Sequence, residues 1–223
     1  MSYQRPVLAA IFDMDGLLID SEPLWHQAEL DIFSGLDLDL SRRHEMPDTV
    51  GLRIDQVVRM WYETSPWSTP SQEEVTRLVM NRALELVETT RPLLPGVEHA
   101  LQLCQDKGLK IGLASASPLF MLERVLDMFG LRSYFSVLAS AESLPYSKPH
   151  PQVYLNAADS LGVDPLNCVT LEDSFNGMIA TKAARMRSIV VPAEDDRNDP
   201  RWALADVRLD SLTKIMPEHL LGR

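Results

Sequence analysis

The sequence Ile11-Phe12-Asp13-Met14-Asp15-Gly16 ends a continuous apolar run that begins at Val7. A short run of this kind is typical of a strand that is buried on both faces, as in a parallel sheet. Asp13 and Asp15 follow where the strand should leave the sheet, and open α/β sheets place their reactive groups at that edge. The acidic pair alone is equally compatible with a solvated turn. The pattern of the remaining chain favours the reactive edge.

Beyond residue 91, short apolar runs alternate with amphipathic helical patterns. The runs that read as strands cover residues 110–114, 137–140, 169–171 and 188–191. The helical patterns cover residues 95–108, 118–129, 151–161 and 175–184. Strands separated by helices of about ten residues form βαβ units, which build a parallel sheet. The predicted fold class is therefore α/β, with a Rossmann-like, doubly wound parallel sheet as its core.

Residues 21–88 lack strand-like alternation and carry three apolar stripes at helical spacing instead. Proline and glycine residues separate the stripes, at Pro47, Gly51, Pro66 and Pro70. This block interrupts the α/β pattern just after the first strand. The sequence therefore predicts a core formed by residues 1–19 and 92–223, with a helical cap formed by residues 20–91.

The composition is that of an ordinary globular protein, with 45% apolar and 24% charged residues in a chain of 223. The net charge of −11 argues against nucleic acid or an anionic membrane as a partner. An anionic substrate would then need a bound cation or local donors to reverse the charge inside the site.

Cys104 and Cys168 have no metal-type spacing and are too few for a disulfide scaffold, so both are expected to be buried apolar residues. The first residues carry no pattern of a signal peptide, and no apolar run reaches the length of a membrane span. We expect a cytoplasmic protein with no membrane partner, and a monomer by default.

The second predicted strand runs into Ser115-Ala116-Ser117-Pro118, just before a helix. Free N–H groups at a helix N-terminus, next to a small hydroxyl residue, can bind an anion. Ser117 is expected to cap this helix, with Pro118 as its first residue. Ser115 lies outside the cap and is predicted to be available to a ligand.

Two further strand ends carry charged residues. Lys148 precedes Pro149, and the restricted backbone could hold its ammonium group against a phosphoryl oxygen, although a lone lysine is more often a surface residue. Glu172 and Asp173 follow the fourth strand and offer hard oxygen ligands suited to Mg²⁺. The alternative is that Asp173 or Ser174 merely caps the next helix.

Taken in order, these motifs resemble those of the haloacid dehalogenase superfamily of phosphohydrolases. The matching residues are Asp13-Met14-Asp15-Gly16, Ser115, Lys148-Pro149 and Glu172-Asp173. The resemblance covers essentially the whole chain, and the helical block looks like the small helical cap of this superfamily. Residues 13–22, 113–118 and 171–186 are most similar to bacterial phosphatases that act on 2-deoxyglucose 6-phosphate and hexitol phosphates.

The resemblance implies a phosphatase that acts on small sugar or sugar-alcohol monophosphates. In this mechanism Asp13 attacks phosphorus to form an aspartyl-phosphate. Asp15 protonates the leaving alkoxide and later takes a proton from water. The phosphoryl oxygens would be held by Ser115, the backbone of Ala116 and Lys148.

The resemblance also implies a Mg²⁺ ion as cofactor. Its ligands would be Asp13, the backbone carbonyl of Asp15, and Asp173, with Glu172 in or next to the ligand shell. Cap residues should select the substrate, and the candidates are Arg53, Trp25, Trp61 and Trp67. The alternative for the tryptophans is packing within the cap.

A sugar-phosphate mutase is the alternative enzyme. In the β-phosphoglucomutases of this superfamily, a cap histidine occupies the position that is Trp25 here. His26 comes one residue later, which rotates its side chain by about 100° on a helix, so it should not substitute. A non-catalytic protein that binds a phosphorylated metabolite is a further alternative. Such a protein would typically lack Asp13 or Asp15, and this chain has both.

Overall fold

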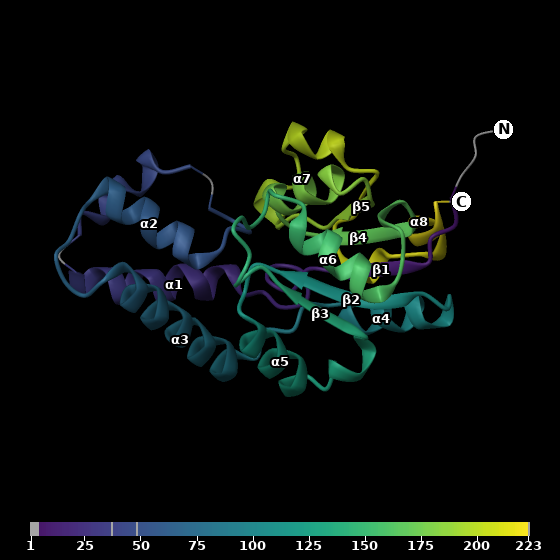
Figure 1. Cartoon of the computed structure of the whole chain (residues 1–223), viewed down its shortest axis with the longest axis horizontal. Coiled ribbons are helices and arrows are strands. Elements are labelled where there is room, and N and C mark those ends of the chain that lie inside the picture. Colours follow the sequence, from purple (N-terminus) through teal and green to yellow (C-terminus); the bar gives the residue numbers. More distant parts are fainter. Residues whose placement is uncertain (1–4, 37, 48, 223) are drawn as a thin grey trace.

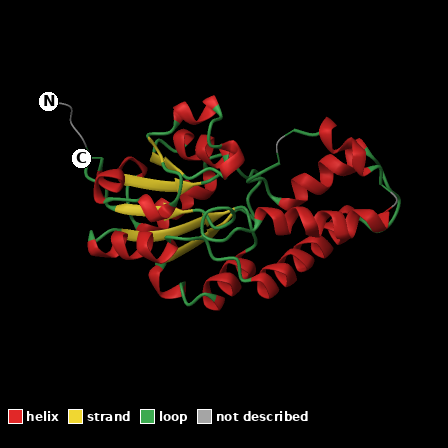
Figure 2. Ribbon diagram, turned by 180° about the vertical axis from the view of Figure 1, so that it is seen from behind, coloured by secondary structure: helices red, strands yellow, loops and turns green. Residues whose placement is uncertain are grey.

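The structure is a computed structural model of the chain, and it describes residues 5–36, 38–47 and 49–222. The start of the chain, considered above for a signal peptide, lies partly outside these residues. A parallel sheet with helices on both faces forms one end of the molecule, and a group of helices without strands forms the other (Figures 1 and 2).

The described residues form one six-stranded sheet in the order β3-β2-β1-β4-β5-β6, and every neighbouring pair is parallel. The strands are β1 (Ala9–Phe12), β2 (Lys110–Ser115), β3 (Val137–Ser140), β4 (Cys168–Glu172), β5 (Arg187–Val190) and β6 (Val207–Arg208). The strand β1 lies between β2 and β4, so its carboxyl end opens onto the middle of the sheet edge. The predicted fold class is confirmed.

Helices cover both faces of the sheet because successive residues of β1 point to opposite sides. Ala10 and Phe12 pack in one apolar cluster with α4 (Val97–Asp106) and α5 (Leu119–Met128). Ala9 and Ile11 pack in the other with α6 (Gln152–Leu161) and part of α7 (Phe175–Ala183). A short helix, α8 (Pro217–Leu221), ends the described chain.

The structure differs from the sequence prediction at several element ends. The strand β1 begins at Ala9 rather than Val7, and the two-residue strand β6 was not predicted. The helix α5 begins at Leu119, and Pro118 rather than Ser117 occupies the N-cap position. The prediction that Ser117 caps α5 is therefore wrong, and its hydroxyl is used elsewhere.

In the described residues between β1 and α4, the chain forms the α-helices α1 (Glu22–Phe33), α2 (Ile54–Thr64) and α3 (Gln72–Thr90). Together with their connections, residues 20–91, they are called the helical segment below. Their buried faces meet in one apolar cluster, which includes Phe33, Val58, Val79 and Ala83. This segment projects from the edge of the sheet where the strands end (Figure 1). Within the described residues, no helix combines the length and the apolar character that crossing a membrane requires.

Candidate active site

A cavity of about 180 Å³ lies between the carboxyl ends of β1 and β2 and the helical segment. Asp13, Asp15 and residues 115–118 line it from the sheet side. Side chains of α1 and of the chain that precedes α2 line it from the other side. The edge of the sheet predicted to carry the chemistry therefore does face a cavity.

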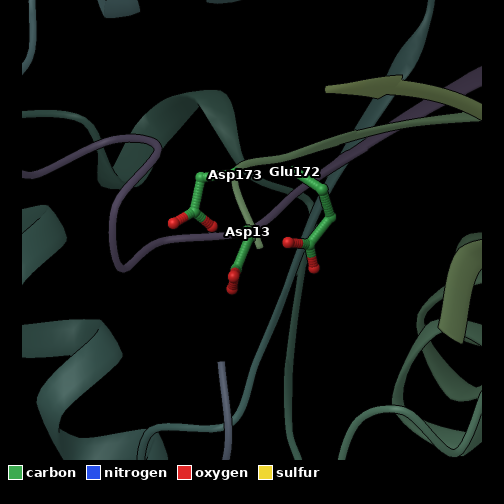
Figure 3. Close-up of side chains that lie close together, drawn as sticks. All are labelled: Asp13, Glu172 and Asp173. Carbon is green, nitrogen blue, oxygen red and sulfur yellow. The ribbon is translucent and has the colours of Figure 1, made fainter. Parts of the chain in front are cut away.

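The structure brings Asp13, Glu172 and Asp173 together. Each carboxylate has one oxygen within 4.8 Å of an oxygen of the others, and Figure 3 shows the three side chains side by side. Their meeting follows from the sheet, because β1 and β4 are neighbours in register at Phe12 and Leu171. Parallel strands end at the same edge, so residues that follow them converge.

Two glycines leave room for these carboxylates. A Cβ atom on Gly16 would lie 1.9 Å from Oδ2 of Asp173, and one on Gly177 would lie 2.0 Å from the carboxyl carbon of Glu172. Gly16 also has a φ of +74°, a backbone conformation that side chains disfavour. Any larger residue at either position would displace a member of the cluster.

Lys148 lies within this cluster. Its Nζ atom is 2.8 Å from Oδ2 of Asp13 and 2.7 Å from Oε1 of Glu172, and its side chain is fully buried. The ammonium group also lies over the ring of Tyr154, whose hydroxyl donates a hydrogen bond to Glu172. Burial would lower the pKa of Lys148, but Asp13 and Glu172 raise it above its ordinary value. Lys148 is therefore not a surface residue, and that alternative from the sequence is wrong.

The cluster has more negative than positive charge. Burial and the charge of Glu172 raise the pKa of Asp13 to about 8, and the same two causes raise the pKa of Asp173 well above its ordinary value. Among the described residues, none donates a hydrogen bond to the buried Oδ1 atom of Asp13. Three carboxylates with one lysine and an unpaired oxygen are suited to a divalent cation with oxygen ligands. The side chain of Asp15 lies outside this group.

The carboxylate of Asp15 instead accepts hydrogen bonds from several donors. Ser21 Oγ and Trp25 Nε1 donate to Oδ1, at 2.7 Å and 3.0 Å. Ser117 Oγ donates to Oδ2 at 2.7 Å, and Ser115 Oγ lies 3.5 Å from the same atom. Ser115 Oγ also accepts a hydrogen bond from the N–H of Ser117, so Ser115 is less available than the sequence suggested.

The sequence named Arg53 as a candidate for selecting the substrate, but it is not among the described residues that line the cavity. Its Nη1 atom donates to the carbonyl oxygens of Ala141 and Leu144, each at 2.7 Å, and its guanidinium group pairs with Asp55. Arg53 thus connects the helical segment to the loop that follows β3.

A second contact joins the helical segment to the sheet. Asn176 Nδ2 donates to the carbonyl oxygen of Val50 at 2.9 Å. A Cβ atom on Gly51 would lie 2.4 Å from Oγ of Ser174, so the two chains pass very close to each other. Ser174 is the N-cap of α7, as the sequence allowed. These contacts hold the helical segment over the cavity.

The three tryptophans separate into two groups. Trp25 lines the cavity and reaches Asp15. Trp61 is buried against Phe33, and Trp67 packs on Tyr62 and donates to a backbone carbonyl nearby. Trp61 and Trp67 therefore pack within the helical segment, which was the alternative to a role in selecting the substrate.

Sequence reasoning missed several residues that line the cavity from the helical segment, among them the polar residues Glu22, Glu29, Arg43 and Thr49. The sequence does contain a pattern that could have indicated Glu29. This residue lies four residues after Trp25 and next to Ala28, on the face of α1 that is otherwise apolar. Arg43 lies in a short 3-10 helix, Leu40–Glu45, where no periodic pattern indicates which side chain points inward.

Comparison with known proteins places these features in a family. The sequence profile of haloacid dehalogenase-like hydrolases matches residues 7–185. Hexitol phosphatase B of Escherichia coli (strain K12) is 67% identical over 222 residues, which cover 100% of both chains.

Two solved structures have the same fold over almost their whole length. A mutant of CbbY from Rhodobacter sphaeroides, in complex with xylulose-(1,5)bisphosphate, aligns with a TM-score of 0.85 and 26% identity over 96% of this chain and 99% of that chain. β-Phosphoglucomutase from Clostridium difficile aligns with a TM-score of 0.81 and 26% identity, over 96% and 95%. These matches confirm the predicted superfamily and the predicted class of enzyme, a phosphatase. The chain belongs to the haloacid dehalogenase-like hydrolase family.

Proposed function

We propose that this enzyme hydrolyses monophosphate esters of small sugars or sugar alcohols, with hexitol phosphates and 2-deoxyglucose 6-phosphate as the first candidates. One observation carries the proposal: Asp13 joins the acidic cluster to the cavity, and Asp15 lies beside it on the cavity wall. The 67% identity to a hexitol phosphatase supports the choice of substrate.

Asp13 is the proposed nucleophile. A carboxylate oxygen of Asp13 forms a bond to phosphorus while the bond between phosphorus and the ester oxygen breaks, which leaves an aspartyl-phosphate and an alkoxide. Asp15 gives its proton to the alkoxide. Asp15 then takes a proton from a water molecule, whose oxygen attacks phosphorus and releases phosphate and free Asp13.

Asp13 must be ionised to attack, and its raised pKa of about 8 opposes this. A divalent cation, proposed here to be Mg²⁺, supplies positive charge that favours the ionised form when bound. Asp13, Asp173, Glu172 and the backbone carbonyl of Asp15 are its proposed ligands. The unpaired Oδ1 atom of Asp13 supports this assignment.

The phosphoryl oxygens are proposed to bind Ser115, the backbone N–H of Ala116 and Lys148. Ser115 and Ala116 line the cavity next to Asp13. Lys148 is already 2.8 Å from Asp13, so its charge acts close to the atom that attacks.

The helical segment is proposed to act as a cap of residues 20–91 on a core of residues 1–19 and 92–223. Its contacts through Arg53 and Val50 support a closed position that keeps bulk water from the cavity.

The direct test is phosphate release from a panel of hexose and hexitol monophosphates, with Mg²⁺ and with a chelator. We expect release that the chelator stops, and loss of nearly all turnover in Asp13→Asn with an unchanged far-UV circular dichroism spectrum. No release, with conversion of β-glucose 1-phosphate into glucose 6-phosphate, would identify a mutase instead. Binding without either reaction would identify a protein that only binds the metabolite.

A further inference from the structure

Two charged residues of the helical segment, Glu29 and Arg43, line the cavity without an assigned role. Trp25, one turn into α1, reaches Asp15. Glu29 lies four residues further along, which on a helix is about 6 Å farther from the sheet. Arg43 lines the cavity from the 3-10 helix Leu40–Glu45, and its positive charge acts on the carboxylate of Glu29. Because α1 projects away from the sheet (Figure 1), the later turns of α1 lie farther from the sheet edge than Trp25 does.

Glu29 is an unusual residue for its place. It is 9% exposed, on the face of α1 that also carries the buried Ala28 and Phe33. Burial raises the pKa of Glu29 to about 6, and the positive charge of Arg43 and the nearby indole of Trp61 oppose this shift. An apolar side chain of similar size would pack there at lower cost. Retention of a carboxylate in a cavity wall indicates a role in binding.

Arg43 is held so that its guanidinium group can serve a ligand. Its Nη2 atom donates to Thr49 Oγ1 at 2.5 Å, and both residues line the cavity. A guanidinium group has five N–H donors, and the bond to Thr49 is the one side-chain hydrogen bond that Arg43 makes to the described residues, so donors remain for a ligand oxygen. The other titratable groups of this wall are Glu22 and His26, so the wall has no excess of positive charge.

We propose that Glu29 and Arg43 form a subsite for the hydroxyl groups at the end of the substrate remote from the phosphate. The carboxylate accepts hydrogen bonds from the hydroxyls, and the guanidinium group donates to their oxygens. The same carboxylate repels a second phosphate at that end, so the enzyme selects polyhydroxy monophosphates over bisphosphates. This inference rests on the proposed function. It adds the residues that bind the hydroxyl groups of the substrate and the class of compound, bisphosphates, that they exclude.

The test is a ratio of specificity constants. Glu29→Gln keeps the size of the side chain and removes its charge. We expect the kcat/KM for sorbitol 6-phosphate, divided by that for p-nitrophenyl phosphate, to fall by about 10- to 100-fold, because the second substrate has no hydroxyl to lose. We also expect fructose 1,6-bisphosphate to inhibit the variant about tenfold more strongly than the wild type. Arg43→Gln should lower the same ratio.

Matched controls lie on the same two elements outside the cavity. Asp31 is exposed on α1 and pairs with Arg82, and Arg42 pairs with Glu45. Asp31→Asn and Arg42→Gln should leave both the ratio and the inhibition unchanged. If Glu29→Gln fails to fold, Glu29→Asp serves: it shortens the side chain but keeps the charge, so the ratio should fall while the bisphosphate stays excluded.

The outcomes separate this inference from the proposed function. Wild-type enzyme that cleaves p-nitrophenyl phosphate but no polyol phosphate would overturn both. Wild-type enzyme that cleaves polyol phosphates, with an equal loss on both substrates or no loss in Glu29→Gln, would overturn the subsite alone. Unchanged inhibition by the bisphosphate would overturn the exclusion of a second charge.

Discussion

The indole nitrogen of Trp25, on α1, donates a hydrogen bond to Oδ1 of Asp15, at 3.0 Å. Ser21 donates to the same oxygen and Ser117 to the other, so both oxygens of the carboxylate are engaged. Donors on both oxygens fix the orientation of the carboxyl group. Because Trp25 belongs to the helical segment, the position of that segment and the orientation of the proposed acid are linked.

Replacing Trp25 by phenylalanine tests this link. The ring remains, but the donor to Asp15 is lost, so the carboxyl group is less well oriented toward the leaving oxygen. We expect kcat for a hexitol phosphate to fall about tenfold and kcat for p-nitrophenyl phosphate to fall less, since nitrophenolate leaves without a proton. Trp67→Phe is the matched control, because that indole donates to Pro70 outside the site. Equal losses on both substrates would contradict the positioning role.

Asp15→Ala removes the proposed acid itself. Proton transfer by a positioned side chain contributes about 10²- to 10⁴-fold, so turnover of alkyl phosphates should fall by that order. With p-nitrophenyl phosphate, the pre-steady-state burst of nitrophenolate, which reports formation of the aspartyl-phosphate alone, should slow much less, because nitrophenolate leaves without a proton. If formation of the aspartyl-phosphate slows by the same factor on both esters in single-turnover assays, Asp15 is not the acid.

Arg53→Ala removes the donors to the carbonyl oxygens of Ala141 and Leu144 and should weaken the closed position of the helical segment. Since closure serves every substrate, we expect kcat/KM to fall about tenfold for sugar phosphates and for p-nitrophenyl phosphate alike. Arg59→Ala is the control, because Arg59 pairs with Glu63 on the exposed side of α2. A loss confined to sugar phosphates would instead assign Arg53 to substrate selection, as the sequence suggested.

Divalent cations should stabilise the protein in a way that depends on pH. The folded state holds a proton on Asp13 up to pH about 8, whereas the unfolded state loses it near 3.8, so without metal the free energy of unfolding falls as pH rises between these values. A cation competes with that proton. We expect Mg²⁺ to raise Tm more at pH 8 than at pH 5.5, measured against a chelator.

Asp173→Asn removes one proposed ligand and should abolish most of this rise in Tm. Asp199→Asn is its control, since Asp199 pairs with Arg201 in the chain that precedes β6. The same rise in Tm in wild type and Asp173→Asn would contradict the assignment of the metal site.

Glu29 should contribute its own pH dependence of stability. Its pKa is about 6 in the folded state against an ordinary value of 4.5, so the folded state binds more protons between these values and the free energy of unfolding falls as pH rises through this window. Glu29→Gln lacks this effect. Relative to wild type, the variant should therefore gain about 2 kcal/mol between pH 4 and pH 7 in urea unfolding. Parallel stability profiles would refute a buried, ionising Glu29.

The order of the elements and the meeting of Asp13 with Glu172 and Asp173 followed from local patterns in the chain. Apolar runs and helical spacing are properties of neighbouring residues, and parallel strands share one edge, so residues that follow them converge. The strand β6 escaped prediction because two residues carry no such pattern.

The partners of individual side chains depended on how the helical segment lies against the sheet. Arg53 reaches carbonyl groups at Ala141 and Leu144, far along the chain, and Ser117 turns from the expected cap to Asp15. Such contacts are set by long-range packing, and no local periodicity encodes them. The sequence thus determined the fold, the family and the edge of the sheet where the acidic residues meet, whereas the tertiary structure determined that Glu29 and Arg43, and not Arg53, line the cavity.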